Sequence, residues 1–217
     1  MLITFSGLDG AGKSTLIEWL RVALEAQRHR VAVLHLEHNV GVYAAVRRVR
    51  DGVARVARRE AGAAMPTRAP RGRIPTLLGR IRHAIVWSKL VRRVIYPLDL
   101  LLFLAYRLYH EAIRRRVVIM DRYFYDTLVD VADGRHWRLL RMLQRLTPTP
   151  DVAVLLDVGP EESYARKRDY PVEYLRDRWQ AYRTVFPWVR GALVIKNDDL
   201  HAAQQAVARL VDERVAA

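Results

Sequence analysis

Cysteine is absent from this chain of 217 residues. Its absence excludes a disulfide framework, a thiolate nucleophile and any zinc or iron–sulfur site built on cysteine. Long apolar runs are missing as well: the strongest, residues 94–106, is too short to cross a bilayer and contains Pro97 and Asp99. Because a strand-like run begins at Leu2, we expect no signal segment. With no apolar run long enough to span a bilayer and no cysteine, we also expect no membrane span and a cytoplasmic location.

Acidic residues are few relative to basic ones. Asp and Glu number 23 against 37 Lys and Arg, which gives a formal net charge of +14. Segment 44–95 holds 14 of the basic residues and only Asp51 and Glu60, so it carries +12 and the rest of the chain +2. Such a segment could bind nucleic acid, another polyanion or an acidic lipid surface. The alternative is a helical insertion whose arginines are only solvated.

The residues that are present include a phosphate-loop motif. The pattern G-x-x-x-x-G-K-[ST] is matched by Gly7-Leu8-Asp9-Gly10-Ala11-Gly12-Lys13-Ser14. It follows an apolar run typical of a strand, and the residues from Thr15 to Leu24 have apolar side chains at helical spacing. In such a loop, backbone N–H groups surround phosphate oxygens, the lysine reaches the β- and γ-oxygens, and the serine hydroxyl can ligate Mg²⁺. Residues 7–15 are therefore the predicted ATP-phosphate site, with Ser14 as a metal ligand.

Strand-like and helix-like segments alternate along the chain. We expect strands at 2–5, 30–36, 117–120, 151–156 and 192–196, and helices at 15–24, 43–59, 75–94, 98–115, 136–146, 160–185 and 200–215. Pro97 should separate two of the helices, and a Gly/Pro/Arg-rich connector covers 62–72. The alternation predicts one α/β domain over residues 1–217, a three-layer sandwich whose five-stranded parallel sheet is flanked by helices, with 44–95 as an Arg-rich helical insertion. Its active site should lie at the carboxyl ends of the strands.

A second cluster follows the third expected strand directly, as Asp121-Arg122-Tyr123. At that place the side chains would emerge beside the phosphate loop. Asp121 can hold Mg²⁺ or its waters, and Arg122 can bind a second phosphate group with a planar fork of donors. The alternative is an ordinary ion pair at the end of a strand.

A third cluster, Arg166-Lys167-Arg168, follows the fourth strand. Phosphoryl transfer needs cations on the moving group, and the variable positions of the phosphate loop contain none. The basic trio is the candidate supplier, in a lid segment at about 160–178 that also contains Arg176 and Arg178 as reserves. A solvated charge run is the alternative.

These segments together resemble the thymidylate kinases of the nucleoside monophosphate kinase group. The resemblance covers both ends and the middle of the chain, and its segments are Phe5 to Thr15, Asp121-Arg122-Tyr123, Leu155-Leu156-Asp157-Val158 leading into Arg166 and Arg168, and Leu101-Leu102-Phe103-Leu104-Ala105-Tyr106-Arg107. It implies a P-loop kinase fold, Mg²⁺ and ATP as cofactors, phosphorylation of a nucleoside monophosphate with dTMP as the leading acceptor, and a homodimer.

The same resemblance implies a role for each residue. Lys13, Arg122, Arg166 and Arg168 would be catalytic, with Lys13 on the donor phosphates and the last two in the lid. Asp9 would lie near the acceptor sugar and the metal, and Arg122 would hold the acceptor phosphate. Tyr123 would be a further acceptor-binding residue. Phe103 would stack on the base, and Arg107, one helical turn later, would reach it. For these two residues the alternative is a core phenylalanine and an arginine that extends to water.

The chain departs from the family on the acceptor side. Where the family has an Arg-Glu-Pro-Gly-Gly type loop after the second strand, this chain has Leu36-Glu37-His38-Asn39-Val40-Gly41. Asp126 and Asp130 take the places of a serine and a tyrosine, so selection of a deoxy sugar is open. Three alternatives therefore remain: a kinase for another phosphorylated acceptor, a P-loop protein that binds nucleic acid or another polyanion, with Trp87 and Tyr96 as stacking residues, and a protein that binds nucleotide without turnover.

Overall fold

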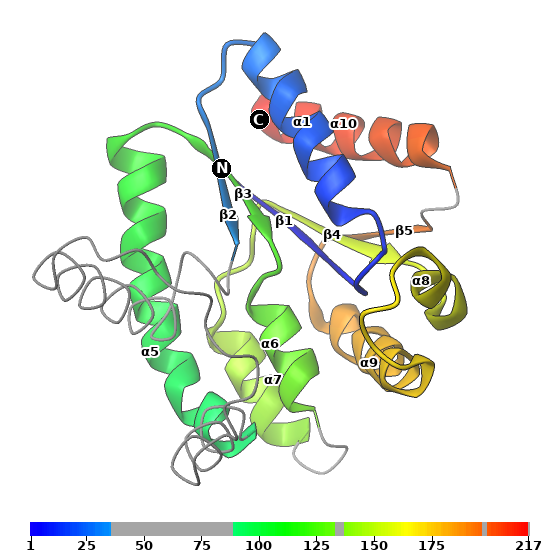
Figure 1. The fold of residues 1–217 in the computed structure, drawn as a ribbon. Coiled ribbons are helices and arrows are strands. Elements are labelled where there is room, and N and C mark those ends of the chain that lie inside the picture. The colour runs from blue at the N-terminus through cyan, green and yellow to red at the C-terminus, as the bar shows by residue number, and fades with distance from the viewer. Residues whose placement is uncertain (36–88, 133–136, 197–198, 217) are drawn as a thin grey trace, which may run out of the picture.

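The computed structural model describes residues 1–35, 89–132, 137–196 and 199–216, and a parallel sheet lies at its centre (Figure 1). The strands are β1 (Leu2–Gly7), β2 (Val31–His35), β3 (Val117–Asp121), β4 (Val152–Asp157) and β5 (Ala192–Lys196), in the order β2-β3-β1-β4-β5. The predicted α/β class and five-stranded parallel sheet are confirmed.

Apolar side chains on both faces explain why the central strands are parallel and buried. All six residues of β1 are buried, and Ile3 pairs with Ile119 of β3 on one side and with Val152 of β4 on the other. Strands that are covered on both faces read as continuous apolar runs, which is the pattern of these segments.

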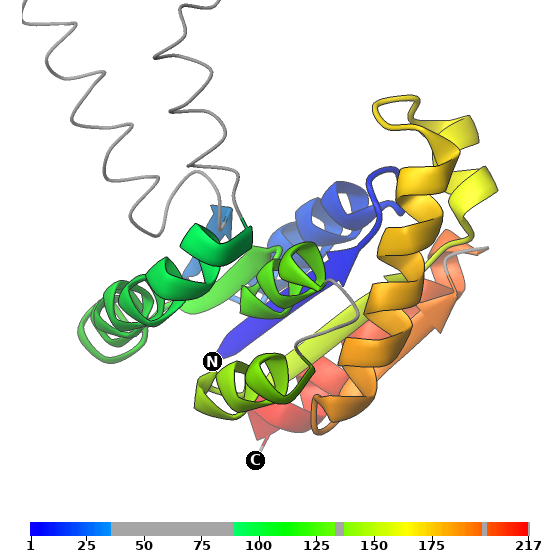
Figure 2. The same cartoon turned by 90° about the horizontal axis from the view of Figure 1, so that it is seen from below.

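Helices cover both faces of the sheet and form the outer two layers. One face carries α1 (Lys13–Ala26) and α10 (Leu200–Ala216), and the other carries α5 (Lys89–Leu108), α6 (Phe124–Val131), α7 (Trp137–Leu146) and α9 (Val172–Val185). Figure 2 shows these last four helices side by side across the sheet. A short helix, α8 (Pro160–Arg166), follows β4, and short turns of π-helix (Tyr109–Ile113) and 3₁₀-helix (Phe186–Trp188) extend α5 and α9.

Helix α5 runs through Pro97 without a break, so the predicted separation of two helices at this residue is wrong. A proline inside a helix removes one N–H donor and crowds the preceding turn. Here the cost is offset by burial, because Tyr96, Leu100 and Phe103 lie on one helix face and are buried in the core. Within the described part of the chain, no helix is long and apolar enough to cross a membrane.

Two other boundaries differ from the sequence prediction. The expected helix at 160–185 is two helices, α8 and α9, and Pro171 stands immediately before the second. Helix α6 was not predicted. The expected helix 43–59, the connector 62–72 and most of the basic insertion 44–95 lie outside the described residues, while 89–95 form the first turns of α5.

Candidate active site

The phosphate-loop motif connects β1 to α1 at the carboxyl edge of the sheet, as predicted. Gly7, Gly10 and Gly12 have φ of 141°, 88° and 89°, conformations that side chains rarely adopt. A Cβ at Gly7 would lie 2.6 Å from the carbonyl oxygen of Leu156, and a Cβ at Gly10 would lie 2.8 Å from that of Ser163. The glycines therefore allow close backbone contact with β4 and α8, and the loop leads to a helix N-terminus, where anions are favoured.

Lys13 lies under this loop and is 7% exposed. Its Nζ donates to the carbonyl oxygens of Gly7, at 2.9 Å, and Leu8, at 2.7 Å. Burial lowers the pKa of Lys13 and the Arg122 charge adds to this effect, although nearby carboxylates oppose it. The lysine thus holds the loop backbone from inside at the β1–α1 turn.

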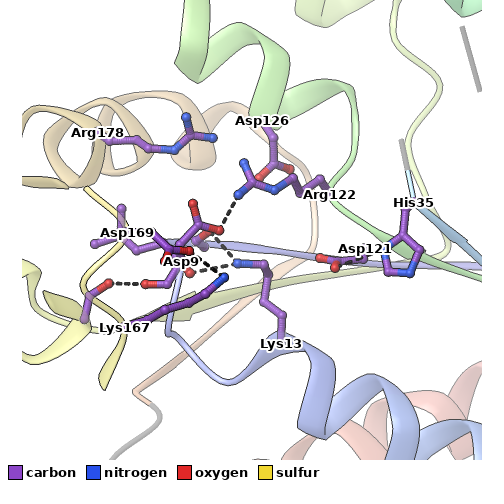
Figure 3. A network of polar contacts seen from close by, with 12 residues as sticks. Asp9, Lys13, His35, Asp121, Arg122, Asp126, Lys167, Asp169 and Arg178 are labelled. Atoms are coloured by element: carbon purple, nitrogen blue, oxygen red, sulfur yellow. Dashed lines mark hydrogen bonds and ion pairs between the residues drawn. The ribbon is translucent and has the colours of Figure 1, made fainter. Parts of the chain in front are cut away.

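Arg122 meets Asp9 across the site, as Figure 3 shows. Arg122 follows β3 and has a φ of 62°, and its Nη2 donates to Asp9 Oδ1. A non-glycine residue in this left-handed region costs about 1–3 kcal/mol and is typical of functional sites. Burial raises the pKa of Asp9, but Arg122, together with Lys13 and Arg178, lowers it overall. Asp9 therefore stays ionised among cations from three elements.

Asp126 is the buried centre of a hydrogen-bond network behind the loop. Its Oδ2 accepts from Ser6 Oγ at 2.6 Å and from the backbone N–H of Tyr123 at 2.8 Å, and its Oδ1 accepts from the Tyr182 hydroxyl at 2.5 Å. Burial raises the pKa of Tyr182, so its hydroxyl keeps the proton that it donates. Asp126 is only 2% exposed. It ties β1, α6 and α9 together and does not face an open acceptor site.

The predicted lid residues lie close to the phosphate loop. Ser163 of α8 is fully buried and its hydroxyl donates to the carbonyl oxygen of Asp9. Arg166 pairs with Glu162 on its own helix, and the Arg168 guanidinium lies 6.0 Å from the centre of the Tyr164 ring.

Lys167 is the member of the basic trio that reaches toward Asp9, and Figure 3 shows the two side by side. Its Nζ pairs with Asp169 at 2.7 Å. The hydrogen bond that Lys167 donates to Asp169 raises the pKa of Lys167, and the Asp9 charge contributes in the same direction. The sequence singled out the arginines on either side, and no local signal distinguished Lys167 from them.

Asp121 lies at the end of β3, and its two carboxylate oxygens have different surroundings. Oδ2 lies 3.2 Å from His35 Nδ1 of β2, whereas Oδ1 is buried and has no hydrogen-bond partner among the described residues. Ser14 and Thr15 lie in the first turn of α1 and are exposed. Within the described ranges, no group of three or more His, Asp or Glu side chains is arranged to hold a metal ion.

Phe103 and Arg107, the predicted base-binding pair, are not brought to the phosphate loop. Phe103 is fully buried and packs edge-on against Tyr123. Arg107 pairs with Glu111 at 2.7 Å and lies 3.4 Å from Asp151. Asp151 stands just before β4, at the amino edge of the sheet, roughly 17 Å from the phosphate loop at 3.3 Å per strand residue.

The structure thus places Phe103 in the core and Arg107 in an ion-pair cluster, and the base-binding role of this pair stays a prediction. Helix α5 runs toward the start of β3, so its last turn, which contains Arg107, lies at the amino edge of the sheet. Tyr123 also lies in the core: its ring is fully buried and its hydroxyl donates to the carbonyl oxygen of Pro148, at 2.7 Å. Its acceptor-binding role stays a prediction.

Known proteins similar to this chain share one name, although no family model matches it. A thymidylate kinase of Chlorobium luteolum is 32% identical over 180 residues, which cover 77% of this chain and 66% of the relative. A thymidylate kinase of Pelodictyon phaeoclathratiforme is 33% identical over 180 residues, covering 77% and 65%. A thymidylate kinase of Bifidobacterium longum is 30% identical over 228 residues, covering 98% and 89%. The chain thus spans just under two thirds of the first two relatives and most of the third.

Proposed function

This chain belongs to the thymidylate kinase family, and from that membership we propose that it transfers the γ-phosphate of ATP to a nucleoside monophosphate, with dTMP as the leading acceptor. We place this activity in the cytoplasm. The observation that carries the proposal is the meeting of Lys13, Asp9 and Arg122 at the carboxyl edge of the sheet. These side chains come from two loops that the sequence separates by more than a hundred residues, and they combine a phosphate-binding turn with a second cation.

The donor would bind at the phosphate loop. Lys13 now donates to two neutral carbonyl oxygens, and phosphate oxygens would offer its ammonium stronger, charged acceptors. The N–H groups at the start of α1 favour the same anion. The end of α8 lies against the phosphate loop, where Arg166 and Lys167 are close to Gly10. These two residues and the lid arginine Arg168 would supply positive charge to the transferred phosphoryl group.

The acceptor would be held by Arg122, whose planar fork suits a phosphate monoester. An oxygen of the acceptor phosphate attacks the γ-phosphorus, the bond from that phosphorus to the bridging oxygen breaks, and ADP leaves with the electron pair. Because a phosphate oxygen is already ionised, no strong general base is needed, and catalysis consists of positioning and charge stabilisation.

Mg²⁺ fits the residues present. The buried Oδ1 of Asp121, which has no hydrogen-bond partner in the described part of the chain, and the exposed hydroxyl of Ser14 are oxygen ligands of the kind that Mg²⁺ prefers. Mg²⁺ commonly keeps several waters beside one or two protein ligands. When bound, the ion would neutralise developing charge on the phosphate oxygens.

The experiment that tests this function is ADP release from ATP and Mg²⁺ with a panel of nucleoside monophosphates that includes dTMP and dUMP. The variant Lys13→Ala is the blank, and we expect it to be slower by about a hundredfold or more. Stimulation by dTMP alone would support the leading acceptor. Stimulation by another monophosphate would keep the kinase and change the substrate, and none at all would refute the proposal.

A homodimer is part of the proposal, through α5. Leu101, Leu104 and Leu108 share one face of this helix and are 64%, 38% and 63% exposed. Leu101→Glu with Leu108→Glu should convert a dimer to a monomer in sedimentation equilibrium, and a monomeric wild type would exclude this interface.

A second candidate use of the chain, polyanion binding, is favoured by the +12 charge of segment 44–95. It predicts nucleic-acid binding that weakens steeply with salt. If no nucleic-acid binding is detected at 50 mM salt, polyanion binding by segment 44–95 is refuted.

A further inference from the structure

Arg178 carries two buried donors that the contacts described above leave unused. It lies on α9 and is 8% exposed. Its Nη1 donates to Asp130 Oδ1 on α6 and to the Tyr174 hydroxyl at 3.0 Å. Its Nε and Nη2 are buried and have no hydrogen-bond partner among the residues that the structure describes. Buried N–H groups of a charged side chain are rarely left without an acceptor, so these two call for one.

The unused donors have the geometry of an anion site. Nε–H and one N–H of Nη2 lie on the same edge of a guanidinium and point in parallel, which suits two oxygens of one phosphate group. The third nitrogen is already fixed by Asp130, so the fork is held in place before any ligand arrives. Such preorganisation lowers the cost of binding.

The position of Arg178 indicates which anion. Figure 3 shows Arg178 reaching from α9 toward Arg122, on the same side of Asp9. The two guanidinium charges repel each other, and Arg178 also acts on the Asp9 carboxylate. The Arg122 and Asp9 side chains each keep 19% of their surface exposed. A phosphate monoester, with a charge near −2, between the two arginines would relieve the repulsion.

We propose that Arg178 is the second phosphate-binding residue of the acceptor site: its Nε–H and Nη2–H donate to two oxygens of the acceptor's phosphate, while Arg122 binds the same group from the other side. This inference rests on the proposed function and names a residue for it. It also accounts for the acceptor side of a chain whose segment 36–41 contains no lysine or arginine.

A purely structural role for Arg178 makes a different prediction. If the residue served only to join α9 to α6 through Asp130, then Asp130→Asn and Arg178→Gln would have similar effects. If it binds phosphate, Asp130→Asn leaves the fork present, and only Arg178→Gln removes it. Arg183→Gln is the matched control, since Arg183 is exposed on the same helix and contacts the Trp179 ring.

The test measures dissociation constants by titration calorimetry for dTMP, for thymidine, which lacks the phosphate, and for ATP. Arg178→Gln should weaken dTMP binding at least tenfold and leave thymidine and ATP within twofold. Asp130→Asn and the control should keep dTMP affinity within threefold. Arg178→Lys keeps the charge and loses the fork, so its dTMP affinity should lie between those of wild type and Arg178→Gln. If Arg178→Gln does not fold, the dTMP affinity of Arg178→Lys tests the assignment instead.

Unchanged dTMP affinity in Arg178→Gln, equal losses for dTMP and thymidine, or equal effects of the Arg178 and Asp130 variants would overturn the assignment. Failure of the proposed function is seen separately, as a wild type that neither binds nor phosphorylates dTMP. In that case inorganic phosphate is titrated into wild type and Arg178→Gln with ADP present at saturation. A loss of phosphate affinity of tenfold or more in the variant would sustain the Arg178 site, and equal or absent binding in both would reject it.

Discussion

Replacing Asp126 by asparagine tests whether its network holds the site together. The carboxylate accepts three hydrogen bonds, from Ser6, Tyr123 and Tyr182, and it is almost fully buried. Asparagine has nearly the same shape, so the substitution removes the charge and one acceptor without leaving a cavity. The change therefore isolates the polar contribution of the network from its packing.

The size of the effect follows from those three bonds. A hydrogen bond to a charged partner contributes about 1.5–3 kcal/mol, and one between neutral groups about 0.5–1.5 kcal/mol. The asparagine oxygen can still accept from Ser6 and Tyr123, but its NH₂ group would face the Tyr182 hydroxyl, which must turn its proton toward the Gly7 carbonyl oxygen at 3.3 Å. With each bond weakened by about 1 kcal/mol, we expect the free energy of unfolding to fall by about 3 kcal/mol and Tm by roughly 6–12 °C.

The assay is urea unfolding followed by circular dichroism, with Asp177→Asn as control, since Asp177 is exposed on α9. The control should change stability by less than about 0.5 kcal/mol. A double-mutant cycle of Asp126→Asn with Tyr182→Phe should give a coupling energy of about 1 kcal/mol or more. A loss below about 1 kcal/mol for Asp126→Asn, or no coupling, would refute the reasoning.

Three further predictions concern the loop, the lid and acid stability. Gly10→Ala places a Cβ 2.8 Å from the Ser163 carbonyl oxygen, so α8 must shift. We expect kcat to fall about tenfold or more while the Kd for ATP changes less than about threefold. An unchanged kcat would show that α8 need not contact the loop. Lys167→Met should lower kcat by about tenfold or more with little loss of ATP affinity, and parallel losses in stopped-flow binding and turnover would exclude a lid role. Because the pKa of Asp9 is lowered from its usual 3.8, its pairing with Arg122 stabilises the fold above that pH and the benefit is lost as pH falls further. The deficit of Asp9→Asn in unfolding free energy should therefore be constant from pH 7 to 5 and shrink below pH 4; a deficit that persists at pH 2 would contradict it.

Much of the fold could be predicted because its signals are local. The buried strands are continuous apolar runs, and the phosphate loop has a defined spacing of glycines before Lys13. Those signals placed all five strands, β1 to β5, and the phosphate loop at the carboxyl edge of the sheet.

Two helices, α5 and α6, depend on tertiary contacts that the sequence does not display. Helix α5 continues through Pro97 because Tyr96 and Phe103 are buried against α6, and α6 itself is a helix of eight residues whose start is fixed by Asp126. The apolar spacing of Tyr96, Leu100 and Phe103 across Pro97 is helical, but the proline outweighed it in the prediction, and the short α6 offered too few turns for a periodic signal.

The site shows the same division. Asp9, Lys13 and Arg122 follow strand ends, so topology alone brings them together. Phe103 and Arg107 were assigned to base binding because residues 101–107 resemble a helix of the family. Where each residue of a helix lies relative to the sheet is set by packing, which this resemblance does not show. Asp126 was noticed only as a departure from the family, whereas its role as a hydrogen-bond centre depends on Tyr182, which lies 56 residues away.

The central claim is that the cluster of Lys13, Asp9 and Arg122 transfers phosphate to a nucleoside monophosphate. Its most direct test is to incubate the protein with Mg²⁺, ATP labelled in the γ-phosphate and dTMP, and to follow the label by chromatography. The account predicts label in dTDP at a rate that Lys13→Ala lowers by about a hundredfold. Label that stays in ATP, or appears only as inorganic phosphate, with every monophosphate tested would contradict it.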